Sequence, residues 1–193
     1  MIKITKENKS DIKEIITALE NGAVLVLPTD TVYGLVCDAT NKKAVAKIYE
    51  IKQRPKFNPL PIFVKEMKMA NELAFIGKEN SKIIKKKWPG KYTFILNRKK
   101  GQKLFGVDKK TIALRISKHL LLNNILRKFD GPLAQTSANI SGQPASTKIN
   151  DVIVYFENSK TKPDLIVDGG NLPKGKPSII MDLTSDNIKI IRN

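Results

Sequence analysis

The sequence predicts a single α/β domain with a mixed parallel and antiparallel sheet and flanking helices. The chain has 193 residues, a length that suits one domain with a substantial buried core. Hydrophobic residues make up 41% and charged residues 27% of the chain, which is ordinary for a globular protein. Helical and extended patterns alternate early and extended patterns cluster late, which favours a mixed sheet over a uniformly parallel one. Because no repeat or flexible linker interrupts this order, we expect one domain over residues 1–193.

Apolar spacing defines the elements of the first half. After Asp11, apolar residues recur at the spacing of a helix face, and Asn21-Gly22 ends this pattern. A short apolar run then leads to Pro28, as is typical of a buried strand. A second helical pattern ends at Arg54-Pro55, because the residue before a proline is disfavoured in a helix. We therefore expect a helix at 11–19, a strand at 23–27, a helix at 42–52, a strand at 60–64, and helices at 67–75 and 80–87.

The second half of the chain is richer in strands. Trp88-Pro89-Gly90 breaks the preceding helix, and a connection rich in lysine and glycine separates the next two apolar runs. His119 stands at the start of a helical pattern, where we expect it to cap the helix or lie at the surface. We expect strands at 92–96 and 111–116, a helix at 119–129, a strand at 132–135, a helix at 150–156, and strands at 165–167, 178–183 and 188–191.

Charge is the unusual property of the composition. Lysine and arginine number 35 against 18 acidic residues, which gives a formal net charge of +17. Residues 78–110 hold 12 basic residues against Glu79 and Asp108, so much of the excess lies in one stretch. Such a field favours polyanions, and we expect an RNA-binding surface there. A compositional bias toward solvated lysine is the alternative.

The remaining composition excludes several classes of protein. No apolar run approaches the ~20 residues of a membrane span, and the N-terminus has no apolar signal core. Cys37 is the one cysteine, which excludes an internal disulfide and fits a reducing compartment, so we expect a cytoplasmic protein. Its place beside an apolar strand favours a small buried residue. With one cysteine and one histidine, His119, the chain has no cluster for zinc, and we expect no metal held by the protein alone.

Residues 170–178 nearly match the loop that binds nucleoside triphosphates. Pro177, however, stands where a hydroxyl should reach the metal ion. The segment also precedes a strand, whereas a phosphate loop opens a helix whose N-terminus faces the phosphates. We therefore predict a plain turn.

Three polar segments carry the more specific signal. The first, 28–35, brings Asp30, two threonines and Tyr33 to the end of an apolar strand, where ligands of α/β sheets usually bind. Its alternative is a helix start capped by Thr29 or Asp30. The second, 52–60, offers cations on a loop stiffened by proline, which suits a phosphate-bearing ligand. Its alternative is a solvated basic helix end.

The third segment, 135–142, surrounds Asn139 with small hydroxyl residues, which let the backbone approach a ligand closely. Together the three segments supply hydroxyls, amides and cations, with no evident general-base histidine or carboxylate pair. Such a site acts by positioning substrates and by stabilising charge on phosphate oxygens. Nucleotidyl or phosphoryl transfer is the class of reaction that fits.

These segments also match a known family. The chain resembles the YrdC-like threonylcarbamoyl-AMP synthases in their short, single-domain form. The resemblance covers roughly residues 10–192 and rests on the order and spacing of 28–35 (PTDTVYGL), 52–55 (KQRP), 58–60 (NPL), 88–90 (WPG), 113–115 (ALR) and 137–142 (SANISG). It implies a twisted sheet that forms a concave basic cavity. It also implies that threonine takes up bicarbonate, attacks the α-phosphate of ATP and releases pyrophosphate, with Mg²⁺ on the phosphates.

The resemblance implies roles for individual residues. Lys52 and Arg54 are the expected catalytic residues, with Lys52 near the phosphates. The expected threonine contacts are Thr31, Arg115 and Ser178, and the expected nucleotide contacts are Arg54, Asn58, Thr111, Ser137, Ala145 and Arg192. Thr111 and Arg115 are four residues apart on a predicted strand, so they should share one face. The product would serve the tRNA threonylcarbamoyl-transferase proteins that modify the adenosine beside the anticodon, and tRNA itself is an expected weak partner.

One position departs from the family pattern. Phe63 stands where many relatives have a histidine that touches threonine, although some bacterial relatives also lack that histidine. Two rival functions remain open at this point. One is a non-catalytic RNA-binding module, suggested by the charge and by Trp88 and Tyr92 among the lysines. The other is a related domain that transfers carbamoyl groups during metal-centre maturation, although those relatives are usually much longer.

Overall fold

The fold is taken from a computed structural model, which describes residues 3–6, 12–55 and 57–192. Its helices are α1 (Ile12–Glu20), α2 (Lys42–Lys52), α3 (Met67–Leu73), α4 (Lys78–Lys87), α5 (Leu120–Phe129) and α6 (Ile149–Glu157). Its strands are β1 (Lys3–Lys6), β2 (Leu25–Leu27), β3 (Gly34–Asp38), β4 (Ile62–Phe63), β5 (Tyr92–Asn97), β6 (Thr111–Arg115), β7 (Leu133–Ser137), β8 (Leu165–Asp168), β9 (Ile179–Asp182) and β10 (Lys189–Arg192).

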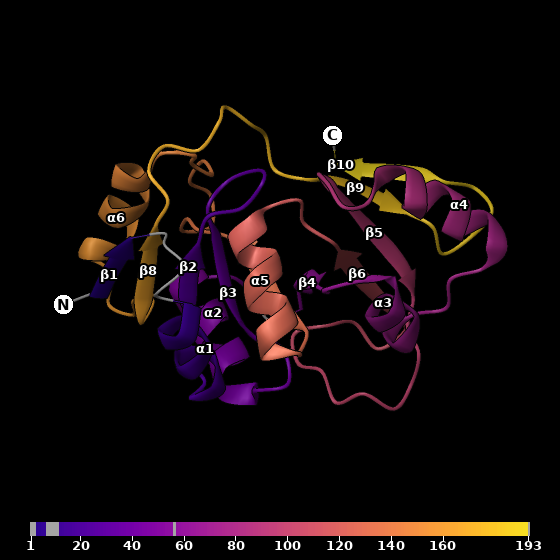
Figure 1. Cartoon of the computed structure of the whole chain (residues 1–193), viewed down its shortest axis with the longest axis horizontal. Helices are drawn as coiled ribbons and strands as arrows, with labels where there is room; N and C mark the ends of the chain where they lie inside the picture. The colour runs from indigo at the N-terminus through magenta and orange to yellow at the C-terminus, as the bar shows by residue number, and fades with distance from the viewer. Residues whose placement is uncertain (1–2, 7–11, 56, 193) are drawn as a thin grey trace.

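One mixed sheet contains all of these strands, in the order β1-β8-β2-β3-β7-β4-β6-β5-β9-β10. The pairs β1–β8, β2–β8, β4–β6 and β5–β9 are parallel, and the other neighbours are antiparallel. The first and last strands described, β1 and β10, are the two edges of the sheet and lie far apart (Figure 1). The prediction of an α/β domain with a mixed sheet is confirmed.

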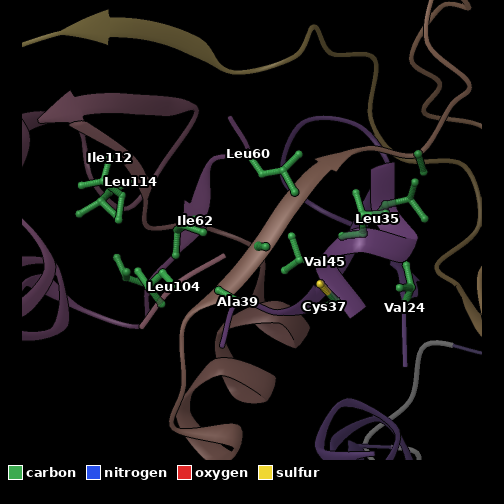
Figure 2. Packing of buried hydrophobic residues seen from close by; sticks show 14 of the residues in the cluster. Val24, Leu35, Cys37, Ala39, Val45, Leu60, Ile62, Leu104, Ile112 and Leu114 are labelled. Carbon is green, nitrogen blue, oxygen red and sulfur yellow. The ribbon is translucent and has the colours of Figure 1, made fainter. Parts of the chain in front are cut away.

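The alternation of side chains along central strands divides the core between two sheet faces. Val26 and Leu35 belong to one buried cluster, whereas their chain neighbours Leu25 and Val36 belong to the other. The first cluster is covered by α2, and Figure 2 shows members of it, among them Leu35 and Val45. The second cluster is covered by α1 and α5, whose apolar faces pack together. Both faces of β2 and β3 are therefore buried.

Local signals set the ends of α2, the helix that leads into the candidate site. Asn41 caps its N-terminus, because the Asn41 side-chain oxygen accepts from the backbone N–H groups of Lys43 and Ala44. Gln53 ends it in the left-handed conformation, with φ +50°. Lys52 is therefore the last helical residue, and Arg54 stands on the loop beyond it.

Several predicted bounds were wrong. Two strands, β1 and β3, were not predicted, and β7 extends beyond its predicted end to Ser137, within the third polar segment. The alternative of a capped helix after Thr29 or Asp30 is wrong, because that segment leads into β3. His119 precedes α5 as the N-cap residue, but its side chain makes no capping hydrogen bond. The predicted helix start at Asp11 and the basic residue Lys56 lie outside the described residues.

Two further sequence expectations concern single elements. Cys37 is fully buried in the first cluster, as its position beside an apolar run predicted (Figure 2). Residues 170–178 lie in the irregular connection between β8 and β9 and open no helix, so the rejection of a phosphate loop is confirmed. The prediction of a plain turn is wrong, because β8 and β9 are far apart in the sheet and the connection crosses between them. Within the part of the chain that the structure describes, no helix has both the length and the apolar character needed to cross a membrane.

Candidate active site

A cavity of about 450 Å³ lies where several distant segments meet. Its walls come from the β2–β3 connection, the end of α2, strands β5 and β6, the end of β7, and β9 with β10. All three polar segments singled out in the sequence reach it. Its polar and charged lining includes Thr31, Lys52, Arg54, Asp108, Thr111, Arg115, Ser137, Asn139, Ser178 and Arg192.

The structure brings eight of the ten predicted site residues to this cavity and leaves two away from its walls. The eight are Thr31, Lys52, Arg54, Thr111, Arg115, Ser137, Ser178 and Arg192. Asn58 and Ala145 are not among the lining residues; the Asn58 carbonyl instead accepts a hydrogen bond of 3.0 Å from the Tyr49 hydroxyl. Thr111 and Arg115 do lie on one wall, as their spacing on β6 predicted.

Arg115 lies in a buried ion pair with Asp30, which the sequence did not predict. Their side chains are 2% and 11% exposed, and Nη2 of Arg115 is 2.7 Å from Oδ1 of Asp30. Nη1 donates to the Thr31 hydroxyl at 3.2 Å and Nε to the Gly90 carbonyl at 3.1 Å. Burial raises the pKa of the Asp30 carboxyl, but Arg115 and hydrogen bonds such as that from Ser117 outweigh it and hold that pKa below its ordinary value.

Phe63 lies beneath this arginine. Strands β4 and β6 pair so that Phe63 stands opposite Arg115, and the guanidinium carbon is 5.6 Å from the ring centroid. The ring is fully buried and is not among the cavity-lining residues. Phe63 is therefore an apolar support for Arg115.

Lys52 is also buried, with only 3% of its surface exposed. Its ammonium donates to the Ser137 carbonyl at 2.9 Å and to the Asn139 side-chain oxygen at 2.7 Å. Burial and, secondarily, the positive charge of Arg54 lower the pKa of the Lys52 ammonium to about 7. The buried Lys52 ammonium therefore links the end of α2 to the end of β7.

Arg54 and Arg192 lie at the cavity with only neutral partners. Arg54 Nη2 donates to the Pro59 carbonyl at 3.1 Å, while its buried Nε has no hydrogen-bond partner among the described residues. Arg192 donates to the Ser178 carbonyl at 2.8 Å and to the Ser178 hydroxyl at 3.1 Å. Burial, and then the charges of Arg115 and Arg54, lower the pKa of Arg192, so Arg192 is repelled by both other guanidiniums.

Two carboxylates at or behind the site, Asp30 and Asp108, were not among the ten predicted site residues. Asp108 lines the cavity, and its Oδ1 accepts from the backbone N–H groups of Lys110 and Thr111 at 2.8 and 2.9 Å. Its spacing before Thr111 is an Asx-turn signal that could have identified the turn. Asp30 was part of a named segment, but its pairing with Arg115 had no local signal, because 85 positions separate the two residues.

The segment 170–178 borders the site by a close backbone approach. A side chain at Gly175 would place its Cβ 2.9 Å from the Thr31 carbonyl oxygen, so glycine is required for this packing. Pro177 and Ser178 then enter the cavity wall, and the Ser178 hydroxyl is 2.8 Å from that of Thr93. Among the described residues, no three histidine, cysteine, aspartate or glutamate side chains form a group that could hold a metal ion.

Comparisons with known proteins agree with one another. The family model of Sua5, YciO and YrdC, described as Telomere recombination, matches residues 17–193. The chain is 34% identical to a Bacillus subtilis protein named threonylcarbamoyl-AMP synthase, over 96% of this chain but only 54% of that protein. It is 30% identical to a Psychromonas ingrahamii protein of the same name, over 83% of this chain and 85% of that one. The solved structure of P. abyssi Sua5 complexed with L-threonine is similar at a TM-score of 0.88 and 31% identity, over 100% of this chain and 57% of that chain.

Proposed function

The chain belongs to the Sua5/YciO/YrdC family, and we propose that it condenses L-threonine, bicarbonate and ATP into threonylcarbamoyl-AMP and pyrophosphate. Relatives from Bacillus and Psychromonas carry the name of this synthase, and a solved relative is complexed with L-threonine. The chain spans about half the length of the Bacillus relative, so what that whole protein does is extended to this chain as part of the proposal.

The convergence of three guanidiniums on one cavity is the observation that carries the proposal. Arg54, Arg115 and Arg192 all line this cavity, and the charges of Arg115 and Arg54 add to burial in lowering the pKa of Arg192. Among the described residues, Asp30 is the carboxylate that pairs with any of them. Holding like charges together is unfavourable unless an anion joins them. A triphosphate and an α-carboxylate in one cavity would supply that negative charge.

We assign the threonine end of the substrate pair to the Arg115 side of the cavity. Three of the five N–H groups of Arg115 have acceptors among the described residues, which leaves donors for a carboxylate. The Thr31 and Ser178 hydroxyls line the same cavity and can accept or donate to small polar groups. A buried carboxylate is unfavourable without a cation partner, and an arginine fork is well suited to it.

The nucleotide end is assigned to Arg54 and Arg192, whose charges have no carboxylate partner among the described residues. Thr111 and Ser137 line the cavity and would contact the nucleotide. Asn58 and Ala145 are retained as nucleotide contacts on the resemblance alone. The unpaired Nε of Arg54 is a donor for a phosphate oxygen. These groups would favour the transition state more than bound ATP, because negative charge grows on the departing pyrophosphate.

Magnesium fits this site as a companion of ATP. Mg²⁺ is usually bound by one or two carboxylates together with substrate phosphates and water, and Asp108 is a carboxylate on the cavity wall. When bound, the ion would neutralise charge on the phosphate oxygens. Under this proposal the protein is a nucleotidyltransferase. Its product would pass to tRNA threonylcarbamoyl-transferase proteins, and the basic stretch 78–110 would bind tRNA weakly.

The proposal is tested by pyrophosphate release with purified protein, ATP, Mg²⁺ and bicarbonate, with each amino acid added in turn. We expect release that depends on threonine and on bicarbonate. Arg54→Ala should lose most of this turnover, whereas Arg127→Ala, on the exposed face of α5, should stay within about twofold of wild type. Binding of tRNA without turnover would instead support an RNA-binding module. Release without threonine dependence would overturn the proposed substrate.

A further inference from the structure

The ammonium of Lys52 is held by short hydrogen bonds to the protein. An ammonium has three N–H donors. The described residues offer it three oxygens: the Ser137 carbonyl at 2.9 Å, the Asn139 Oδ1 at 2.7 Å and the Ser137 hydroxyl at 3.5 Å. The first two contacts are short and the third is at the limit of a hydrogen bond, so two of the three N–H groups are committed to the loop. The geometry is therefore mainly that of a brace between α2 and the loop.

Asn139 continues the same network into the loop 137–143. While its side-chain oxygen accepts from Lys52, its Nδ2 donates to the carbonyls of Ile140, at 3.1 Å, and Gln143. The backbone N–H of Ser141 donates to the Lys52 carbonyl at 2.9 Å. The loop is thus closed on itself by Asn139 and attached to the last residue of α2 through both the side chain and the backbone of Lys52.

Both sides of this brace line the cavity. Arg54 follows Lys52 by two residues, and Ser137, Asn139 and Ser141 face the same space from the loop. A shift of the loop relative to α2 would therefore change the distance between Arg54 and the opposite wall. A buried, poorly solvated ammonium is unfavourable for stability in itself. The presence of this ammonium at the junction is explained if the site needs a fixed distance between its two walls.

We propose that Lys52 and Asn139 are positioning residues, which hold the loop 137–143 against the end of α2 and thereby shape the nucleotide side of the cavity. The inference rests on the proposed function for its effect on ATP, but the brace itself is a property of the ligand-free protein. It replaces the direct contact between Lys52 and phosphate that the family resemblance implies.

Hydrogen exchange on the ligand-free protein tests the brace without reference to activity. Lys52→Met removes the ammonium and keeps the aliphatic stem, and Asn139→Ala removes both halves of the amide. Each variant should speed exchange of the Ser141 and Gln143 amides about tenfold or more, because their protection depends on the closed loop. Lys47→Met is the matched control, since Lys47 lies on the same helix and pairs with Asp164 at 2.6 Å. Unchanged exchange in Lys52→Met would overturn the proposal.

A double-mutant cycle on kcat/KM for ATP tests whether Lys52 and Asn139 act through the same loop. If both residues act through the loop, each single variant loses about ten- to a hundredfold and the double variant loses little more than the worse single one. The threonine KM should stay within about twofold in all three. If the two losses multiply, Lys52 and Asn139 act independently, and the proposal is wrong.

A second variant covers the case in which Asn139→Ala does not fold. Asn139→Asp keeps an oxygen acceptor for Lys52 but loses the donors to Ile140 and Gln143, so exchange at Gln143 should rise more than exchange at Ser141. Equal rises at the two amides, or none, would contradict the assigned contacts. If the wild-type protein makes no adenylate, the proposed function fails, whereas the exchange results still decide whether the brace exists.

Discussion

The ion pair between Asp30 and Arg115 gives a prediction whose size follows from burial. Asp30→Ala removes the carboxylate and leaves the guanidinium, which is 2% exposed, without a counter-charge among the described residues. Leaving one partner of a buried pair unpaired typically costs about 3–5 kcal/mol. The Ser117 hydroxyl, which also donates to Asp30, loses its acceptor at the same time. We therefore expect the free energy of unfolding to fall by about 3–5 kcal/mol at pH 7.

Urea denaturation of wild type and variant measures this difference. The control is Glu79→Ala, which breaks the Glu79–Lys82 pair, whose side chains are 79% and 68% exposed. An exposed pair contributes about 0–1 kcal/mol, so the control should lie within that range. If Asp30→Ala costs less than about 1 kcal/mol, or no more than Glu79→Ala, the reasoning about desolvation at this pair is refuted.

The same variant has a pH signature. The pKa of Asp30 in the folded protein lies below its ordinary value, so its carboxylate stabilises the fold above the unfolded-state pKa. That contribution is lost as the pH falls through the folded-state pKa. The difference in unfolding free energy between wild type and Asp30→Ala should therefore be largest near neutral pH and shrink at acidic pH. A difference that stays constant down to acid unfolding would contradict the assignment.

Three further predictions concern Arg115, Lys52 and two lysines of α4. Arg115→Lys keeps the positive charge but loses the two parallel N–H donors of the guanidinium. The threonine KM should therefore rise about ten- to a hundredfold, while the ATP KM changes much less. An unchanged threonine KM in steady-state kinetics would show that Arg115 does not bind threonine. Because the pKa of Lys52 is about 7 and Arg54 contributes to lowering it, a triphosphate beside Arg54 should raise that pKa. ATP binding at pH 8 should then take up protons, and calorimetry in buffers of different ionisation enthalpy should detect this uptake in wild type but not in Lys52→Met. Lys85→Glu with Lys86→Glu, on the exposed face of α4, should flatten the salt dependence of tRNA binding and leave adenylate synthesis within about twofold. An unchanged salt slope would favour solvated lysine bias.

The fold could be predicted wherever a strand or helix carried its own apolar pattern. β1 did not, since its four residues are mostly exposed and it is extended only because it pairs with β8, about 160 positions later. β3 was obscured for the opposite reason. Four of its five residues are buried, so it lacks the alternation of a half-exposed strand, and the polar residues before it also fitted a capped helix start. The strand order depends on such distant pairings, and no local pattern specifies them.

For the site, the sequence predicted which residues line the cavity but not which groups they pair with. The sequence identified the polar segments, and eight of the ten residues carried over from the family resemblance line one cavity. It did not identify what each cation pairs with. Arg115 pairs with Asp30, which is 85 positions away in the sequence, and Lys52 donates to Asn139, which is 87 positions away. A lysine in a basic motif predicts a charge near the ligand; its actual hydrogen bonds depend on which wall the fold brings beside it.

The four cations of the cavity differ in the negative charge or polarity of their hydrogen-bond partners. Under the proposed function, this difference would let one cavity bind two different anions. Arg115 has a carboxylate partner, and Lys52 has a carbonyl and an amide oxygen. Arg54 and Arg192 have only neutral oxygens within the described residues. A polyanion gains most where positive charge is least compensated, whereas a single carboxylate is served by a neutralised but well-oriented fork. Under the proposed function, the triphosphate would therefore bind beside Arg54 and Arg192, and the α-carboxylate beside Arg115. The two reactants would then meet between these sides of one cavity, as an attack on the α-phosphate requires.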